Sequence, residues 1–318
     1  MTIANVVNSH KVLMLLTSDF VTARYEALRA RAPELKIITE IGSKSDPDVT
    51  ALFAFKLSAG VAPLLPNLRL AASVGAGADG ILSAPDLPLH VKVTRAVEPG
   101  LGFSMAQFVC MQILRHFRSL PTIEEQQAAG EWKRLQIPDA PQTTVGIMGL
   151  GSIGSVVANA VAALGFNVIG WARSNKRTTN IPVFVGAEGM DAFLRQSNYL
   201  VCLLPATPQT CGLLDRISLS KLPRGSYLIN VARGGILVEQ DLLALVDEGH
   251  LSGAALDVFA TEPLPPASAF WGHKKVLVTP HIAAQPSVSP VVDQFLDNLQ
   301  RLVNAEPLIN EVDRSLGY

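Results

Sequence analysis

The sequence of 318 residues has little cysteine and no marked excess of charge of either sign. Its three cysteines, Cys110, Cys202 and Cys211, lie far apart in apolar or mixed runs and form no C-x-x-C pair. This spacing argues against a disulfide framework and against a zinc site, and it favours reduced thiols in a cytoplasmic protein. The formal net charge of −1 argues against nucleic acid or an anionic membrane as the main partner.

The sequence also lacks a basic block, a signal-peptide pattern, internal repeats and low-complexity segments. It has no charged residue between Asp139 and Arg173, so a membrane span is conceivable there. However, several glycines and an asparagine interrupt the apolar runs, which is more typical of a buried β-α-β unit. With 48% hydrophobic residues, the chain can bury two cores, and we expect no membrane partner.

That uncharged stretch contains the motif around which the rest of the chain is interpreted. Residues 145–148 are typical of a buried strand, a helix is predicted to about residue 164, and a second strand over 168–171. The G-x-G-x-x-G turn between the first strand and the helix is predicted to bind a dinucleotide. The helix N-terminus would hold the phosphates with free N–H groups. The turn consists of Gly149, Leu150, Gly151, Ser152, Ile153 and Gly154.

Short strands alternate with helices along the whole chain, which predicts an α/β fold with parallel sheets. Because the glycine-rich turn begins near residue 149, the N-terminal third is expected to form a separate domain. We predict a substrate domain of residues 1–102 with 285–318 and a dinucleotide-binding domain of residues 103–284. Both sheets are expected to be Rossmann-like or flavodoxin-like, with the active-site cleft between the domains. Residues 97–102 contain strong helix breakers and are a candidate hinge, and a long helix is predicted over residues 103–120.

Three polar residues each lie just beyond a predicted strand of the second domain. Arg233 follows the strand 227–230, Glu262 follows the strand ending at residue 257, and His281 follows the strand 276–279. Taken singly, they are better explained as a surface cation, a turn residue before proline and a structural histidine. Ligands of open α/β sheets bind at the carboxyl ends of the strands, so the three together indicate a site.

These residues belong to motifs that resemble the D-isomer-specific 2-hydroxyacid dehydrogenases over nearly the whole chain. The motifs are GAGAD at 75–79, the dinucleotide turn, LPATPQT at 204–210, NVARG at 230–234, DVF with EPL at 257–264, and TPHIA at 279–283. The branch that the chain resembles most is the glyoxylate/hydroxypyruvate reductase A type. Residues 146–149 (GIMG), Phe270-Trp271 and the C-terminal residues 312–318 carry this finer resemblance.

The resemblance implies an NAD(P)H-dependent reduction of small 2-oxo acids. His281 would donate the proton, because imidazole titrates near the working pH, and Glu262 would stabilise the imidazolium. Arg233 would bind the substrate carboxylate with its planar fork, and the N–H groups of Ala76 and Gly77 would hold the same group. Hinge closure would then exclude water. No metal is implied.

The resemblance also implies further cofactor contacts, and a homodimer formed through the long helix. Asp257 would bind the nicotinamide carboxamide. Gln107 receives no role, since many relatives carry Glu there. Phe55 and Lys56 follow a predicted strand and are candidates for the acyl side of the pocket, with their roles left open. The other cofactor contacts are Leu204, Pro205, Thr210, Val231 and Ala232.

The end of the second strand of the dinucleotide motif predicts a preference for NADPH over NADH. Rossmann enzymes that use NAD usually place Asp or Glu there, to bind the ribose 2′-hydroxyl. Here the position is Ala172, followed by Arg173 and Ser174, with Lys176 and Arg177 nearby. A guanidinium and a hydroxyl favour a 2′-phosphate, although NAD(H) stays possible.

Two other functions are open at this level. A dinucleotide-sensing corepressor of similar fold keeps the same Arg, Glu and His, but such proteins usually carry long disordered tails, which this sequence lacks. A phosphonate or formate dehydrogenase of the same fold is another alternative. Formate enzymes typically have Gln in place of Glu262, which disfavours that choice.

Overall fold

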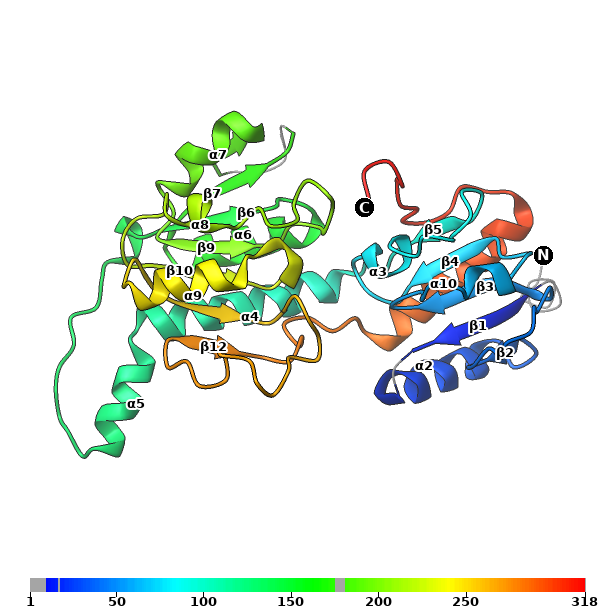
Figure 1. Ribbon diagram of the computed structural model, residues 1–318, viewed down its shortest axis with the longest axis horizontal. Helices are drawn as coiled ribbons and strands as arrows, with labels where there is room; N and C mark the ends of the chain where they lie inside the picture. Colours follow the sequence, from blue (N-terminus) through cyan, green and yellow to red (C-terminus); the bar gives the residue numbers. More distant parts are fainter. Residues whose placement is uncertain (1–9, 17, 175–180, 318) are drawn as a thin grey trace. The chain divides into compact units, whose positions relative to one another are not determined.

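The computed structural model describes residues 10–16, 18–174 and 181–317 (Figure 1). The chain divides into two compact units: Met1–Gly100 with Gln285–Tyr318 (unit 1), and Leu101–Ala284 (unit 2). The first change of unit lies two residues before the boundary predicted after residue 102. Both units contain a parallel sheet covered by helices, so the predicted α/β fold class is confirmed.

Unit 2 contains a seven-stranded parallel sheet in the order β12-β11-β10-β9-β6-β7-β8. The chain reverses its direction of winding between β6 and β9, and dinucleotides bind at such a switch point in this type of sheet. The strands are β6 (Thr144–Met148), β7 (Asn167–Ala172), β8 (Val183–Val185), β9 (Tyr199–Cys202), β10 (Ser226–Asn230), β11 (Leu251–Leu256) and β12 (Val276–Val278).

Helices cover both faces of this sheet, which explains why its central strands are almost wholly apolar (Figure 1). On one face, α4 (Pro99–Phe117) and α6 (Ser152–Ala163) pack on the sheet through residues such as Val109, Ile113 and Val157. The other face is covered by α7 (Gly186–Leu194), α8 (Arg216–Leu219) and α9 (Glu239–Asp247). The glycine-rich turn follows β6 and leads into α6, as the sequence predicts.

Within the candidate hinge 97–102, α4 begins at Pro99, and the change of unit lies between Gly100 and Leu101, so that the hinge stays a prediction. Proline is well tolerated in the first turn of a helix, where its missing N–H needs no partner. Helix α4 ends at Phe117, three residues before the predicted end, because Ser119 adopts a left-handed φ of 54°. A separate helix, α5 (Leu120–Ala128), follows and extends away from the sheet of unit 2 (Figure 1).

Unit 1 contains a five-stranded parallel sheet in the flavodoxin-like order β2-β1-β3-β4-β5. Helices α2 (Ser18–Arg31) and α10 (Val288–Asn304) pack on one face, where Phe53 stacks on Phe295 at a centroid distance of 4.4 Å. The short helix α3 (Asp79–Leu82) and the 3₁₀ turn Ala62–Leu64 cover the other face. The strands are β1 (Lys11–Leu15), β2 (Lys36–Ile38), β3 (Val49–Ala54), β4 (Leu70–Ser73) and β5 (Lys92–Thr94).

One buried carboxylate holds both segments at which the chain changes unit. Glu98 is 9% exposed, and its Oε2 accepts a hydrogen bond of 2.7 Å from the N–H of Gly100. Its Oε1 accepts a hydrogen bond of 3.1 Å from the N–H of Ser287, which directly precedes α10. Arg24 donates to the neighbouring carbonyl of Pro286 at 3.2 Å. The outgoing and returning segments are therefore fixed side by side within unit 1.

The part of the chain that the structure describes contains no helix long and apolar enough to cross a membrane. Its three cysteines are free thiols, with Cys202 buried, Cys110 half-buried and Cys211 exposed. Burial raises the pKa of the Cys202 thiol to about 12. This cysteine is therefore an inert apolar side chain of the sheet rather than a nucleophile.

Candidate active site

Arg233, Glu262 and His281 lie beyond three neighbouring strands of unit 2. Arg233 follows β10, Glu262 follows β11 and His281 follows β12, and these strands are adjacent and parallel. The carboxyl ends of parallel strands meet at one edge of a sheet, so the three loops project from the same edge. The residues predicted to act together are therefore brought to one place.

His281 and Glu262 form a hydrogen-bonded pair. Oε2 of Glu262 lies 2.7 Å from Nδ1 of His281, and its Oε1 accepts a hydrogen bond of 2.9 Å from the N–H of Phe259. An ionised carboxylate can only accept, so Nδ1 is the donor, and Nε2 is the nitrogen that remains for a ligand. Nε2 has no partner among the described residues, and the side chain of His281 is 50% exposed.

The surroundings of Glu262 keep its carboxylate ionised. Partial burial by itself raises the pKa of Glu262, but the hydrogen bonds from His281 and from the Phe259 N–H lower it. The positive charges of His281 and Arg233 act in the same direction, and the resulting pKa lies below the ordinary value for glutamate. The anion beside His281 thus persists at neutral pH and disappears only as the pH falls through this lowered pKa.

For the 2-oxo acid reduction that the resemblance implies, we expect Glu262→Gln to shift the pH profile towards lower pH. The amide preserves the shape of the side chain but removes the negative charge that stabilises a protonated His281. The rate of reduction by the variant would therefore begin to fall at a lower pH than that of the native chain. Initial rates measured across the pH range test this, and an unchanged profile would contradict the proposed role of the pair.

Asp257 holds the loop that carries His281. Its side chain is 1% exposed, and Oδ1 accepts hydrogen bonds from Oγ1 of Thr279 at 2.6 Å and from the N–H of Ile282 at 2.9 Å. Oδ2 accepts from the N–H of Ala283 at 2.8 Å, and the backbone carbonyl of Asp257 accepts from the N–H of His281 at 2.9 Å. His281 itself has a left-handed φ of 56°, an uncommon conformation that surrounding bonds must maintain. The predicted carboxamide contact of Asp257 stays a prediction.

The loop of Arg233 is fixed in two ways. The buried side chain of Asn230 accepts a hydrogen bond from the N–H of Ala232 and donates one to the carbonyl of Arg233, both at 3.2 Å. Gly234 lies so close to the backbone of Phe259 that any side chain would collide with it. Residue 234 must therefore be glycine, which keeps the loop of Arg233 against the loop of Glu262. Arg233 is half-buried, and its Nη1 donates to the carbonyl of Ala232 at 2.7 Å.

The glycine-rich turn fits a dinucleotide phosphate. Helix α6 begins after Gly151 with no side-chain cap and no acidic residue in its first turn. The N–H groups of Ser152 and Ile153 have no acceptor among the described residues, and a side chain at Gly151 would meet only open space. Gly154 instead packs directly on the carbonyl of Gly149, where no side chain fits. An uncapped, uncharged and open helix N-terminus suits an anion.

The remaining residues predicted to contact the cofactor lie at the same edge of the sheet. Leu204, Val231 and Ala232 are almost buried at the ends of β9 and β10. The hydroxyl of Thr210 donates to the carbonyl of Pro205 at 2.7 Å and accepts from the N–H of Thr207 at 2.8 Å, so it shapes this loop.

The predicted selectivity residues follow β7. Ala172 ends that strand and is 4% exposed, whereas Arg173 and Ser174 are exposed. No acidic side chain occupies these three positions. Lys176 and Arg177 lie outside the described residues.

Ala76 and Gly77 form the turn after β4 in unit 1. Their N–H groups have no acceptor among the residues that the structure describes. The carbonyl of Gly75 accepts from the N–H of Ala96 at 2.9 Å, and the carbonyl of Gly77 accepts from Oγ of Ser73 at 2.6 Å. Successive unpaired backbone N–H groups form a concavity that favours anions. Phe55 packs beside this turn, since a Cβ on Gly75 would touch its ring at 3.4 Å, and Lys56 is exposed.

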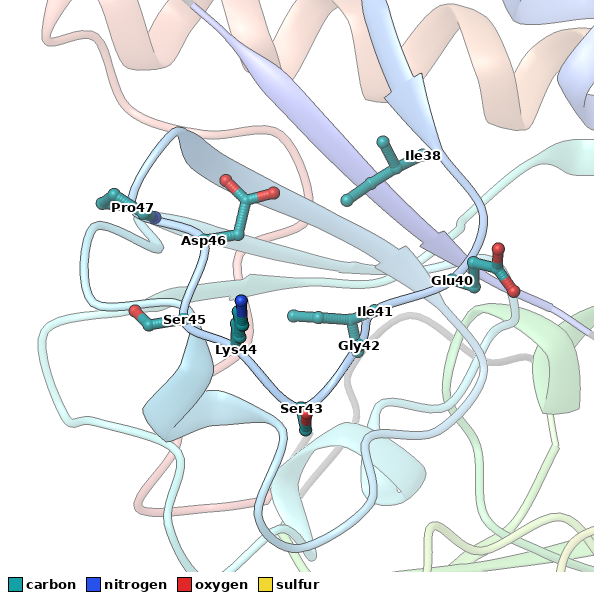
Figure 2. Close-up of a pocket in the computed structure, with 9 residues that line it drawn as sticks. All are labelled: Ile38, Glu40, Ile41, Gly42, Ser43, Lys44, Ser45, Asp46 and Pro47. Carbon is teal, nitrogen blue, oxygen red and sulfur yellow. The ribbon is translucent and has the colours of Figure 1, made fainter.

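Sequence reasoning missed the residues that position the site rather than form it. The clearest examples are Asn230 and the hydrogen bonds by which Asp257 holds the loop of His281. A polar residue at the very end of a buried strand was the available signal for both. A pocket lies in the loop between β2 and β3 and is lined by residues between 38 and 47 (Figure 2). None of the predicted site residues lines it.

The comparison with known families agrees with this geometry. The profile of the NAD-binding domain of D-isomer specific 2-hydroxyacid dehydrogenases matches residues 110–283. The chain belongs to the D-isomer-specific 2-hydroxyacid dehydrogenase family. Within the family it is similar to glyoxylate/hydroxypyruvate reductase A of Klebsiella pneumoniae strain 342. The two are 38% identical over 256 residues, which cover 79% of this chain and 82% of that protein. The predicted family and branch are thus confirmed.

Solved structures extend the similarity to the whole fold. A D-isomer specific 2-hydroxyacid dehydrogenase from Xanthobacter autotrophicus Py2, in complex with NADPH and MES, has a TM-score of 0.90 and 37% identity. It covers 98% of this chain and 100% of its own. An NADPH-dependent glyoxylate/hydroxypyruvate reductase from Sinorhizobium meliloti, in complex with NADP and sulfate, has a TM-score of 0.89 and 36% identity, covering 97% and 100% respectively.

Proposed function

We propose that the protein reduces small 2-oxo acids of the glyoxylate and hydroxypyruvate type to D-2-hydroxy acids with NADPH. The observation that carries this proposal is the His281–Glu262 pair, whose 2.7 Å bond leaves Nε2 of His281 for a substrate. Arg233 stands at the same edge of the sheet, and the glycine-rich turn fits a dinucleotide. The similarity to two glyoxylate/hydroxypyruvate reductases supports the choice of substrate.

In this mechanism each residue of the chain has a distinct task. Arg233, with the N–H groups of Ala76 and Gly77, binds the substrate carboxylate and orients the adjacent carbonyl. The glycine-rich turn before α6 would hold NADPH, which when bound would supply a hydride for the carbonyl carbon. Nε2 of His281 gives its proton to the oxygen, and Glu262 stabilises the imidazolium that exists before this transfer. Asp257 keeps His281 in place through its four bonds to residues 279–283.

A rate comparison tests the proposal directly. The purified chain is assayed with glyoxylate, hydroxypyruvate, pyruvate and phenylpyruvate, each with NADPH and with NADH. The proposal expects the highest kcat/KM for glyoxylate or hydroxypyruvate with NADPH. Dinucleotide binding without turnover would instead favour the corepressor-like alternative. A second assay offers phosphonate with NAD⁺ and with NADP⁺, and oxidation of phosphonate without reduction of any 2-oxo acid would favour a different dehydrogenase of the same fold.

The preference for NADPH rests on the end of β7, where Ala172 replaces the acidic residue of NAD enzymes. Two like unit charges about 4 Å apart repel by about 4 kcal/mol at an effective dielectric constant of ~20, so a carboxylate there would exclude a 2′-phosphate. We expect the double variant Ala172→Asp, Arg173→Ala to change the preference from NADPH to NADH, as measured by the ratio of the two kcat/KM values. A higher kcat/KM with NADH in the native chain would contradict this interpretation.

A homodimer is part of the proposal, and exposed apolar side chains support it. On α4, Phe103, Met111 and Leu114 are 61%, 51% and 36% exposed and repeat with helical spacing along one stripe. Helix α5 has no buried residue, and Trp132, after it, is 95% exposed. Contiguous apolar surface of this kind is typical of protein interfaces.

The three free cysteines support the proposed location in a reducing cytoplasm.

We expect the native chain to be a dimer at micromolar concentration, and Met111→Glu to weaken it. A charge in the middle of an apolar interface remains unpaired when the partner binds, which costs several kcal/mol. Light scattering coupled to size-exclusion chromatography measures both masses. Lys274→Glu, at an exposed position before β12 and outside α4, α5 and the segment that follows them, provides a control with a charged side chain already at the surface. A monomeric mass for the native chain would refute the prediction.

A further inference from the structure

The turn at Ala76 and Gly77 is held by three hydrogen-bonded carbonyls in succession. The carbonyl of Gly75 accepts from Ala96 N–H, that of Gly77 from Ser73 Oγ, and that of Ala76 from Nη1 of Arg95 at 3.2 Å. In a planar trans peptide, the N–H points opposite to the carbonyl of the same peptide. The N–H of Ala76 therefore points away from the Ala96 N–H, and the N–H of Gly77 points away from the Arg95 guanidinium. The carbonyl of Gly77 belongs to the next peptide, which carries the N–H of Ala78.

Among the three donors, Arg95 is the charged one. It follows β5, the neighbour of β4 in the sheet, and its side chain is half-buried. Arg95 forms no ion pair with any acidic residue of the described chain, and Ala76 is its hydrogen-bond partner there. Burial lowers the pKa of the Arg95 guanidinium, which still stays protonated at neutral pH. Among the described residues of unit 1, this half-buried positive charge has no counter-ion, and it binds the peptide that carries the unpaired N–H of Gly77.

We propose that Arg95 is a positioning residue for the substrate carboxylate. This inference rests on the proposed function, in which Ala76 and Gly77 hold that carboxylate. By binding the carbonyl of Ala76, Arg95 fixes the Ala76–Gly77 peptide so that the N–H of Gly77 faces the ligand. Its charge also polarises this peptide, which makes the N–H a stronger donor. The uncompensated cation further attracts an anion to the turn.

The same unit provides a matched control arginine. Arg69 lies at the start of β4, at the opposite end of the strand, and its Nη2 donates to the carbonyl of Leu302 at 3.1 Å. Like Arg95, it forms no ion pair with a described acidic residue. Arg69→Met and Arg95→Met therefore remove the same charge and the same kind of hydrogen bond from one unit. Only Arg95→Met affects the turn.

The test uses the full chain with NADPH and two measurements. The first is the dissociation constant of oxamate, an unreactive carboxylate that resembles the substrate, by calorimetry. The second is the pair of KM and kcat for glyoxylate. We expect Arg95→Met to raise both the oxamate constant and the glyoxylate KM about tenfold, the size of a weakened charge-assisted contact. The kcat and the KM for NADPH should stay unchanged. Arg95→Lys keeps the charge, so its oxamate dissociation constant and its glyoxylate KM should lie between those of the native chain and those of Arg95→Met.

Several outcomes would overturn the inference. Oxamate affinity that is unchanged in both Arg95 variants would do so, and so would an equal loss in Arg69→Met. A fall in kcat without a change in KM would indicate a general structural defect instead. If Arg95→Met does not fold, Arg95→Lys decides the question with the same two measurements. If the native chain reduces no 2-oxo acid, the proposed function fails, and the oxamate constants alone still decide whether Arg95 supports anion binding.

Discussion

Replacing His281 by glutamine is expected to lower kcat for 2-oxo acid reduction by about 10²–10⁴-fold, the usual contribution of a general acid. Glutamine can still donate a hydrogen bond to Glu262, but it has no proton to give to the developing alkoxide. The dissociation constant of NADPH should hardly change, because the glycine-rich turn after β6 is untouched. Steady-state kinetics and a fluorescence titration with NADPH measure the two quantities.

A second histidine of unit 2 serves as the control. His273 also pairs with a carboxylate, with its Nε2 3.1 Å from Oδ1 of Asp247, but it lies before β12 rather than after it. It therefore belongs to the opposite edge of the sheet. His273→Gln should keep the kcat of the native chain. Comparable losses in the two variants would show that histidine–carboxylate pairs stabilise the fold here, and would contradict a proton transfer by His281.

Arg233→Lys is expected to reduce kcat/KM for glyoxylate roughly 10²-fold, since each hydrogen bond to a charged group contributes about 1.5–3 kcal/mol. Lysine keeps the positive charge but loses the planar fork that binds a carboxylate with two parallel bonds. Arg216→Lys provides the control, because Arg216 pairs with Glu248 on the surface of unit 2, with both distances at 2.8 Å. Near-native kcat/KM in Arg233→Lys would mean that charge alone is sufficient.

The sequence predicts the central strands of the sheets well and most of the edge strands poorly. The strands β6, β7 and β10 are almost entirely buried, and their predicted positions, 145–148, 168–171 and 227–230, agree with the structure to within one residue at each end. Of the four three-residue strands in the described chain, β2, β5 and β8 were not predicted, because so short a run shows no periodicity, whereas β12 was predicted over residues 276–279. Helix α5 was missed for another reason: it buries no side chain, so it has no apolar face to recognise.

The chemical residues of the site could be predicted, whereas the contacts that position them could not. Arg233, Glu262 and His281 stand at strand ends, which a sequence reveals. The left-handed conformation of His281 and the bonds from Asp257 that maintain it depend on how β11 and β12 lie side by side. Arg95 likewise meets Ala76 only because β5 pairs with β4. Such contacts join residues far apart in the chain, and no local pattern records them.

The carboxylate of Glu98 has a consequence for how this chain can be cut and rejoined. It binds the N–H groups of Gly100 and Ser287, so the two ends left by removing residues 101–284 lie within reach of a short loop. The cost of closing so short a gap is small. In terms of domain architecture, unit 2 is thus a domain inserted into the flavodoxin-like unit 1. The sheet of unit 1 and the helices α2 and α10 that pack on it come from the segments before residue 101 and after residue 284. A different module can be grafted at this junction without interrupting the core of unit 1.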